Sequence, residues 1–213
     1  MIGPRRSELK RVVIVVTGAS GVVLAIRLVE VLRERDVETL CVVTGRALVV
    51  ADHECVSREW FLGVLSKFCT KVYREGDWES PLASSSFDID ACIAVPLTVT
   101  SAAKLSLGIY DNLALRALGN CIRLGRPVVA VVRECPLGVA ELRALLRLAE
   151  MGVRIVPAVV GFYAKPASIK DVVDFIVGKV LDVLGIENDL YARWGSEDSS
   201  RAQTLDPCRA LYG

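Results

Sequence analysis

Histidine is almost missing from this chain of 213 residues, and His53 is the only one. Sites that need several His ligands are therefore excluded, and a Ser-His or Cys-His nucleophile pair is excluded unless His53 belongs to it. The seven cysteines are odd in number and form no C-x-x-C pair. This pattern indicates neither a zinc site nor a disulfide scaffold, so we expect most cysteines to be small buried hydrophobic residues.

An excess of charge is also missing, because the formal net charge is +1 and the pI is about 7.5. The chain thus has no basic field to attract nucleic acid. No apolar run reaches the roughly 20 residues that span a bilayer, and residues 1–10 are polar and basic, unlike a signal peptide. We expect a cytoplasmic protein without nucleic-acid or membrane partners, and its length suits one buried core.

What the chain does contain is a series of short β-branched runs. Arg11–Val16 is the clearest, and it leads through a turn of small residues into a helical pattern over residues 22–35. A continuous apolar run is typical of a strand buried on both faces, as in a parallel sheet covered by helices. Similar runs occur at Thr39–Val43, Ala91–Val95, Pro127–Val132 and Val153–Val156.

Helical patterns alternate with these runs. They are expected at Ala47–Glu54, Thr100–Leu107, Asn112–Leu124, Val139–Glu150 and Ile169–Leu184. The β-α-β-α order predicts an α/β fold with an open, mostly parallel, doubly wound sheet in three layers, of the Rossmann-like kind. We expect residues 1–187 to form this domain, and residues 188–213 to form a C-terminal tail that packs on the domain or on a neighbouring subunit.

Ligands of such sheets bind outside the carboxyl ends of the strands, so the loops after the strands hold the candidate site residues. The turn Gly18-Ala19-Ser20-Gly21 follows the first strand, but it is not a G-x-G-x-x-G motif. Its backbone N–H groups and the helix dipole can face an anion or a ring edge. A plain tight connection explains the same residues equally well, because Gly and Ser also serve turns and caps.

Hydroxyl groups follow another strand, at Thr98-Val99-Thr100-Ser101. This segment suits a phosphate or a flavin edge, and helix capping is an equally good explanation. The run Ser84-Ser85-Ser86 is best interpreted as a solvated connector.

Charged residues in the second half form the more telling group. Arg116 and Arg123 lie on one expected helix, Arg133-Glu134 follow the strongest strand, and Lys179 lies in a late apolar helix. Together they can bind a phosphate, and a nearby Glu can exchange protons with it. For Arg116 or Arg123 alone, a solvated helix surface is the better explanation.

Three further residues stay ambiguous at this level. Tyr163 follows the last strand and either reaches the site or simply packs. Surface positions are the default for His53 and Glu54, which end a short helix.

Taken in order, a longer series of segments resembles the flavin prenyltransferase family, part of a wider superfamily of flavoproteins. Its segments are spread over nearly the whole chain. The residues that carry the resemblance are Thr17–Gly21, Asp111-Asn112-Leu113 with Arg116-Ala117, Arg133–Leu137, Met151-Gly152, Val156-Pro157-Ala158, Gly161-Phe162-Tyr163 with Pro166, Asp171–Phe175, Leu184-Gly185-Ile186 and Arg193-Trp194-Gly195.

The resemblance implies an enzyme that joins a dimethylallyl group from dimethylallyl phosphate to N5 and C6 of reduced FMN. The product would be prenylated FMN for a partner decarboxylase, and the family forms homo-oligomers in which trimers build a dodecamer. FMN would be held by Gly18, Ala19, Ser20, Thr44, Thr98, Val99, Thr100, Ser101 and Arg133.

The same resemblance assigns the donor site. Its residues would be Arg116, Arg123, Glu134, Tyr163 and Lys179, with Glu54 and Trp194 lining the prenyl pocket. Ser20, Glu54 and Glu134 would be the catalytic residues. The implied reaction needs no metal, because a cationic site stabilises the departing phosphate and either that phosphate or Glu134 accepts the final proton.

Several positions depart from the family pattern. The family usually has Cys at the position of Leu97 and either Lys or Gly at the position of Thr100. Thr44 stands where Ser is common. Arg123 stands where Lys is common, and Lys179 where Arg is common, so the charge persists while its geometry changes. The alternatives are a redox flavoprotein, an FMN carrier, and a Cys-containing decarboxylase; the last lacks its Pro-x-Met-Asn segment.

Overall fold

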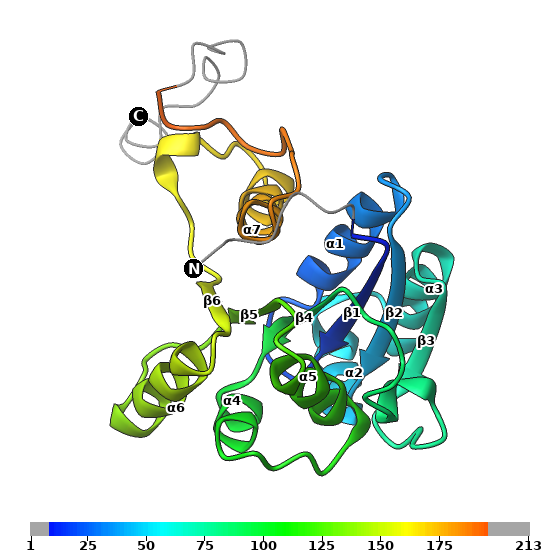
Figure 1. Cartoon of the computed structure of the whole chain (residues 1–213). Coiled ribbons are helices and arrows are strands. Elements are labelled where there is room, and N and C mark those ends of the chain that lie inside the picture. The colour runs from blue at the N-terminus through cyan, green and yellow to red at the C-terminus, as the bar shows by residue number, and fades with distance from the viewer. Residues whose placement is uncertain (1–8, 196–213) are drawn as a thin grey trace. The chain divides into compact units, whose positions relative to one another are not determined.

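The computed structural model describes residues 9–195, and its centre is one sheet of six parallel strands (Figure 1). The strand order is β3-β2-β1-β4-β5-β6, and all neighbouring pairs are parallel. The strands are β1 (Arg11–Val16), β2 (Glu38–Val43), β3 (Lys71–Arg74), β4 (Ala91–Leu97), β5 (Val128–Val132) and β6 (Arg154–Pro157). The predicted parallel α/β sheet is therefore confirmed.

Helices separate the strands along the chain. They are α1 (Val23–Arg33), α2 (Gly45–Glu54), α3 (Arg58–Phe68), α4 (Val99–Ser106), α5 (Leu113–Arg123), α6 (Val139–Glu150) and α7 (Ile169–Leu184), with short 3₁₀ turns η1 (Pro81–Ala83) and η2 (Phe162–Ala164). Two elements, β3 and α3, were not predicted from the sequence. β3 is a short edge strand in which only Tyr73 is buried, and α3 buries only Phe61 and Leu65, so neither carries a strong apolar pattern.

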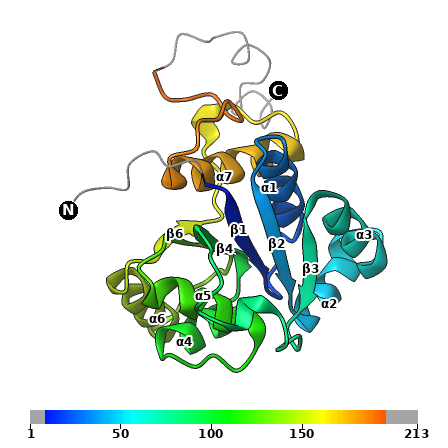
Figure 2. The same cartoon turned by 45° about the vertical axis from the view of Figure 1, so that its right-hand side comes forward.

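Both faces of β1 are buried, which accounts for its unbroken β-branched sequence. Val13 and Val15 belong to a core cluster with residues of α4 and α5. Val12 and Ile14 point to the opposite face, where α1 lies against the sheet, and all four side chains are inaccessible to solvent. Figure 2 shows the helices on both sides of the sheet. The three-layer arrangement follows from this two-sided burial.

The order of the strands reverses between β1 and β4. From β1 the chain moves outward through β2 to β3, and it then returns to β4 on the other side of β1. At such a point, the loops that follow the two neighbouring strands run in opposite directions. They leave room for a ligand outside the carboxyl ends of the strands. The loops after β1 and β4 are thus placed side by side by the topology.

The cysteines correct one expectation. The structure contains the disulfides Cys41–Cys69 and Cys92–Cys121, although the sequence pattern indicated none. Each bond joins a strand to the end of a helix, over a sequence separation of 28 or 29 residues. No short-range spacing reveals such pairs, because the fold alone brings the two Cα atoms to 6.5 and 6.4 Å. Cys55 and Cys135 are free thiols, and Cys208 lies outside the described residues.

The chain divides into two compact units, Met1–Pro157 and Ala158–Gly213. The first contains the sheet and α1 to α6. In the described part of the second, residues 186–195 fold back on α7, where Asn188, Tyr191 and Arg193 all bond to Asp182. Within residues 9–195, no helix is both long and apolar enough to cross a membrane.

Candidate functional site

The loops after β1 and β4 are joined by Thr17. Its hydroxyl donates a hydrogen bond to the carbonyl oxygen of Pro96, and it accepts one from the backbone N–H of Thr98, both at 2.8 Å. The N–H of Thr17 donates to the same carbonyl at 3.1 Å. Thr17 is only 2% exposed, so these bonds are shielded from water and fix the two loops to one another.

The turn after Thr17 needs glycine for steric reasons. A Cβ atom on Gly18 would lie 2.5 Å from the Cβ of Arg46, far inside van der Waals contact. Gly21 has a φ of +102°, which side chains disfavour. Ala19 is buried, whereas Ser20 is exposed and carries the accessible hydroxyl of the turn. The turn is therefore shaped by close packing on α2, and it presents Ser20 to solvent.

Glu54 is the last residue of α2, and its side chain lies against the N-terminus of α1. Its carboxylate accepts hydrogen bonds from the N–H of Gly21, at 2.8 and 3.0 Å to the two oxygens, and from the N–H of Val22 at 3.0 Å. A negative charge is favourable there because of the helix dipole. These backbone donors are thus already engaged by a carboxylate, so a phosphate group has to be bound by other parts of the site.

Another helix start lies next to this turn, at α4. Thr98 caps α4, because its hydroxyl oxygen accepts the N–H of Ser101 at 3.0 Å and donates to the Ser101 hydroxyl at 2.8 Å. Val99 is partly buried and Thr100 is exposed in the first turn. Thr44 has the same capping role in α2, where it accepts the N–H of Ala47 at 3.2 Å. Capping and ligand binding are compatible here, since a helix start attracts anions.

Arg133 and Glu134 follow β5 directly. The guanidinium of Arg133 lies 3.6 Å from the Glu134 carboxylate, which also accepts the N–H of Cys135 at 3.2 Å. The Nε atom of Arg133 is buried and has no hydrogen-bond partner among residues 9–195. A buried donor of this kind calls for an acceptor, and a phosphate or flavin oxygen would supply one. The residues present therefore fit an FMN molecule.

One polar face of α5 carries Arg116, Asn120 and Arg123. The Nε of Arg116 donates to the carbonyl oxygen of Ala83 at 3.0 Å. The Asn120 amide donates to the carbonyls of Leu82 and Ala83 at 3.2 and 3.4 Å, and its oxygen accepts from Arg123 at 2.6 Å. This face of α5 is therefore hydrogen-bonded to two backbone carbonyls of η1, those of Leu82 and Ala83.

The second unit holds an aromatic and cationic cluster of its own. The ring of Tyr163 meets the rings of Phe175 and Trp194 edge to face, with centroids 5.8 and 5.6 Å apart. Lys179 donates to the hydroxyl of Tyr191 at 2.8 Å. Burial disfavours the Lys179 ammonium, but hydrogen bonds to Tyr191 and Tyr163 outweigh that effect and raise its pKa above 10.5. Lys179 thus stays a cation beside two phenols.

Comparisons with known proteins identify the family of the chain. The flavoprotein family model matches residues 2–181. The flavin prenyltransferase UbiX of Saccharolobus solfataricus is 39% identical over 192 residues, which are 89% of this chain and 94% of that protein. The chain belongs to the flavin prenyltransferase family.

Two solved structures extend the match to three dimensions. One is AnUbiX (PadA1) in complex with FMN and dimethylallyl pyrophosphate, with a TM-score of 0.83, 31% identity, and coverage of 89% of this chain and 100% of that one. The other is a dodecameric FMN-dependent UbiX-like decarboxylase from Escherichia coli O157:H7, with a TM-score of 0.82, 31% identity, and coverage of 87% and 100%. Sequence and structure therefore place the chain in the same flavin prenyltransferase family.

The structure brings some of the predicted family residues together. The turn at Gly18 and the loop at Thr98 are joined through Thr17, and Tyr163 contacts Trp194. Arg116 and Arg123 lie on α5, and no hydrogen bond or ion pair of the described residues joins them to Arg133 or Glu134. In residues 9–195, no group of three or more His, Cys, Asp or Glu side chains could hold a metal ion.

Three residues that make well-defined contacts were not among the predicted site residues. They are Thr17, Asn120 and Tyr191. Thr17 could have been found as a polar residue at the end of a buried strand, because a hydroxyl there must find partners. Asn120 is 2% exposed and lies between two arginines at i−4 and i+3, which is the spacing of one helix face. Nothing in the sequence marks Tyr191.

Proposed function

We propose that this chain is a flavin prenyltransferase that joins the dimethylallyl group of dimethylallyl phosphate to N5 and C6 of reduced FMN. The observation that carries the proposal is the match over 89% of the chain to a structure that holds FMN and dimethylallyl pyrophosphate. The Arg133 Nε without a partner supports it independently, since it calls for an acceptor. A partner decarboxylase in the cytoplasm would receive the prenylated FMN.

The acceptor would lie along the loops after the strands. Its binding residues would be Gly18, Ala19, Ser20, Thr44, Thr98, Val99, Thr100, Ser101 and Arg133. Reduced FMN supplies the nucleophilic nitrogen and the ring carbon of the reaction. The Thr17 bonds keep two of these loops in register, and the Gly18 turn allows close backbone approach. These contacts orient the acceptor before the donor reacts.

The donor would be held by cations and a phenol. Arg116, Arg123, Tyr163 and Lys179 would bind its phosphate together with Glu134. When the allylic C–O bond breaks, negative charge builds up on the departing phosphate oxygen, and fixed cations stabilise that charge. The exposed ring of Trp194 would stabilise the positive allylic group through its π face.

A proton has to leave when the second bond forms at C6. The acceptor would be the released phosphate or the carboxylate of Glu134, which stands next to Arg133. Ser20 is exposed at its turn and would contact the flavin near N5. Glu54 accepts hydrogen bonds at the start of α1 and would line the prenyl pocket. No step of this sequence needs a His base or a metal.

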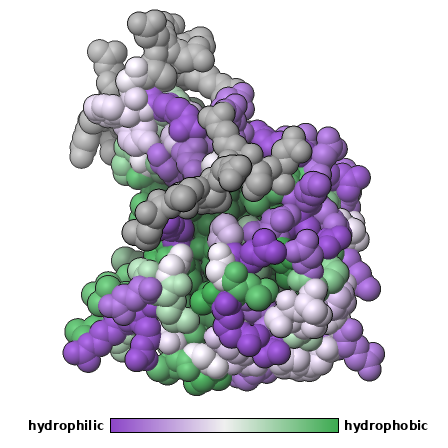
Figure 3. All heavy atoms as spheres, viewed as in Figure 1, coloured by the Kyte–Doolittle hydropathy of each residue, from purple (hydrophilic) through white to green (hydrophobic). Residues whose placement is uncertain are grey.

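We also propose that the protein is a homo-oligomer, in the form of trimers that build a dodecamer. Apolar residues reach the surface over α4 and α6 (Figure 3). Leu107 and Leu146 are 61% and 60% exposed, and both line a hollow of about 430 Å³ between these helices. Ile109 is exposed as well, whereas Leu105 is buried. Exposed apolar surface of this kind is typical of subunit contacts.

The experiment is an anaerobic incubation with reduced FMN and dimethylallyl phosphate, followed by mass spectrometry of the extracted flavin. A gain of one C5 prenyl unit is expected. Glu134→Gln should abolish it, and Glu79→Gln, an exposed residue outside the site, should not. Unmodified FMN with both the monophosphate and the pyrophosphate donor would contradict the proposal and favour a redox flavoprotein or an FMN carrier.

A further inference from the structure

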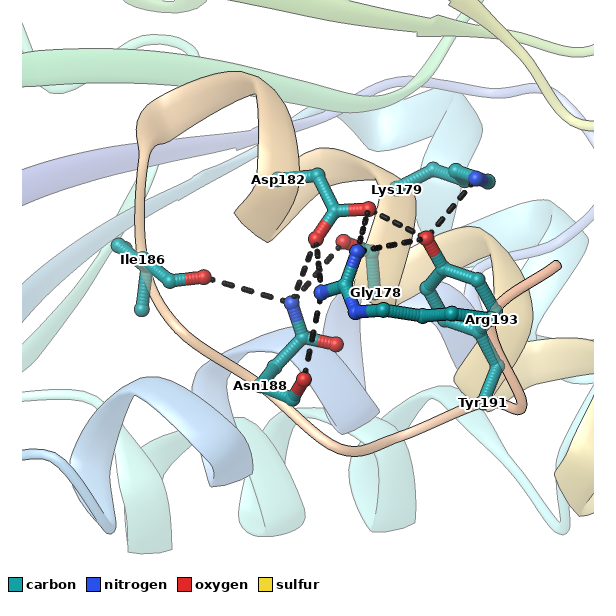
Figure 4. A network of polar contacts seen from close by, with 7 residues as sticks. All are labelled: Gly178, Lys179, Asp182, Ile186, Asn188, Tyr191 and Arg193. Carbon is teal, nitrogen blue, oxygen red and sulfur yellow. Dashed lines mark hydrogen bonds and ion pairs between the residues drawn. The ribbon is translucent and has the colours of Figure 1, made fainter. Parts of the chain in front are cut away.

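Tyr191 lies between a cation and an anion of α7 (Figure 4). Its hydroxyl oxygen accepts a hydrogen bond from Lys179 at 2.8 Å, and its O–H donates to the carboxylate of Asp182. The Lys179 nitrogen also lies 4.5 Å from the centre of the Tyr191 ring. One phenol therefore connects Lys179 to Asp182, which is three residues further along the same helix.

The position of this phenol is fixed from several sides. Asp182 is held by Arg193 at 2.7 Å and by the amide of Asn188 at 2.9 Å. The Tyr191 ring meets Phe175 edge to face at 5.1 Å, and it packs so close to Gly178 that a Cβ there would lie 2.6 Å from the ring. Tyr191 is only 8% exposed. The hydroxyl is thus a rigid acceptor for Lys179.

A rigid acceptor matters more for lysine than for arginine. Lys179 carries a point charge on a flexible four-carbon stem and has no planar fork that aligns itself on a phosphate. Here the ammonium is bonded to Tyr191 and lies 5.4 Å from the centre of the Phe175 ring, which itself contacts Tyr163. The ammonium is thereby kept next to the Tyr163 phenol rather than free in solvent.

We propose that Tyr191, supported by Asp182, is a positioning residue that holds the Lys179 ammonium beside Tyr163 for the phosphate of the prenyl donor. The proposal rests on the proposed function, since it assigns the ligand of Lys179. It adds a residue of the C-terminal segment to the determinants of donor binding.

The first test is Tyr191→Phe, which keeps the ring and removes the hydroxyl. We expect the KM for dimethylallyl phosphate to rise about tenfold, because a charge-assisted hydrogen bond is lost, while kcat and FMN affinity change less than about twofold. Tyr73→Phe is the matched control, since Lys71 also lies over that ring, at 4.9 Å in β3. An unchanged KM, or an equal loss of FMN affinity, would overturn the proposal.

A double-mutant cycle tests whether Tyr191 acts through Lys179. The dissociation constant of dimethylallyl monophosphate is measured on the FMN-bound protein for Tyr191→Phe, Lys179→Ala and the double variant. The Tyr191 effect should nearly vanish when Lys179 is absent. An additive loss would mean that Tyr191 is merely structural, and it would overturn the proposal. Asp182→Asn should reproduce the Tyr191→Phe phenotype in weaker form.

Limited acetylation of lysines separates this proposal from the proposed function. Mass spectrometry should show that Tyr191→Phe raises the acetylation of Lys179 several-fold relative to Lys71, whether or not the protein transfers a prenyl group. Unchanged labelling of Lys179 would overturn its positioning by Tyr191, even in an active transferase. A wild-type protein that binds no dimethylallyl phosphate would overturn the assigned ligand as well as the proposed function.

Discussion

Arg123 donates a hydrogen bond from its guanidinium to the side-chain oxygen of Asn120, at 2.6 Å. The amide group of Asn120 donates in turn to the carbonyls of Leu82 and Ala83. One buried amide therefore holds an expected donor-binding arginine and anchors α5 to η1. Without the hydrogen bond to Asn120, the exposed side chain of Arg123 would sample many conformations.

The first prediction replaces this amide by an apolar group of similar size. Asn120→Leu should lower the free energy of unfolding by about 1–3 kcal/mol, because the buried carbonyl of Leu82 loses its donor, whereas that of Ala83 keeps Arg116. It should also raise the KM for the prenyl donor, because Arg123 loses its partner. Thermal denaturation and donor kinetics check the two effects. Leu124→Asn, at an exposed position of the same helix end, is the control. An unchanged melting temperature of the Asn120→Leu variant would contradict the prediction.

The second prediction concerns the turn that would carry the flavin. Gly18→Ala should abolish FMN binding, because the new Cβ would meet the Cβ of Arg46 at 2.5 Å and displace the turn or α2. Gly63→Ala is the matched control. A Cβ atom on Gly63, which lies within α3, would meet nothing within 4 Å, so the change should stabilise the helix by about 0.5–1 kcal/mol. Fluorescence titration with FMN and thermal denaturation measure the two variants, and normal FMN affinity in Gly18→Ala would refute the steric argument.

The third prediction follows from the two disulfides. Each closes a loop of nearly thirty residues, so loss of one should lower the free energy of unfolding by about 3–4 kcal/mol. Reductant should therefore lower the melting temperature. Without reductant, alkylation of the unfolded protein should leave Cys41, Cys69, Cys92 and Cys121 unmodified. Cys55→Ser should leave the effect of reductant unchanged, and alkylation of all four cysteines would contradict the pairing.

The sequence determined much of the sheet because its strands are buried on both faces. The apolar patterns predict Arg11–Val16 to the residue, as well as the helices Val139–Glu150 and Ile169–Leu184, since each pattern is unambiguous. β3 was missed because an edge strand buries little, and the disulfides were missed because their partners meet only in the fold.

The candidate site was less predictable, because its side chains are fixed by contacts between distant segments. The bond from Thr98 to Thr17 spans 81 residues, and that from Gly21 to Glu54 spans 33. Glu54 is exposed, as the sequence predicts, but only the fold shows that its carboxylate bonds to the N-terminus of α1. Family resemblance can name such positions, but the partners Asn120 and Tyr191 follow only from the fold of this chain.

The last prediction is a pH dependence that originates at Asp182. Burial by itself raises the pKa of this carboxyl, but hydrogen bonds from Arg193, Tyr191 and Asn188 outweigh it and hold the pKa below 3.8. A carboxyl with a lowered folded-state pKa stabilises the protein above its unfolded pKa, and this contribution is lost as the pH falls through the folded-state pKa. Thermal denaturation of wild type and Asp182→Asn should therefore differ by a constant amount near neutral pH, and the difference should shrink below about pH 4. Arg193→Gln removes the hydrogen bonds from Arg193 to Asp182. In that background, Asp182→Asn should change the stability by a smaller amount at every pH. A difference that persists undiminished at pH 2 would show that the Asp182 carboxylate charge is not what stabilises the C-terminal segment on α7.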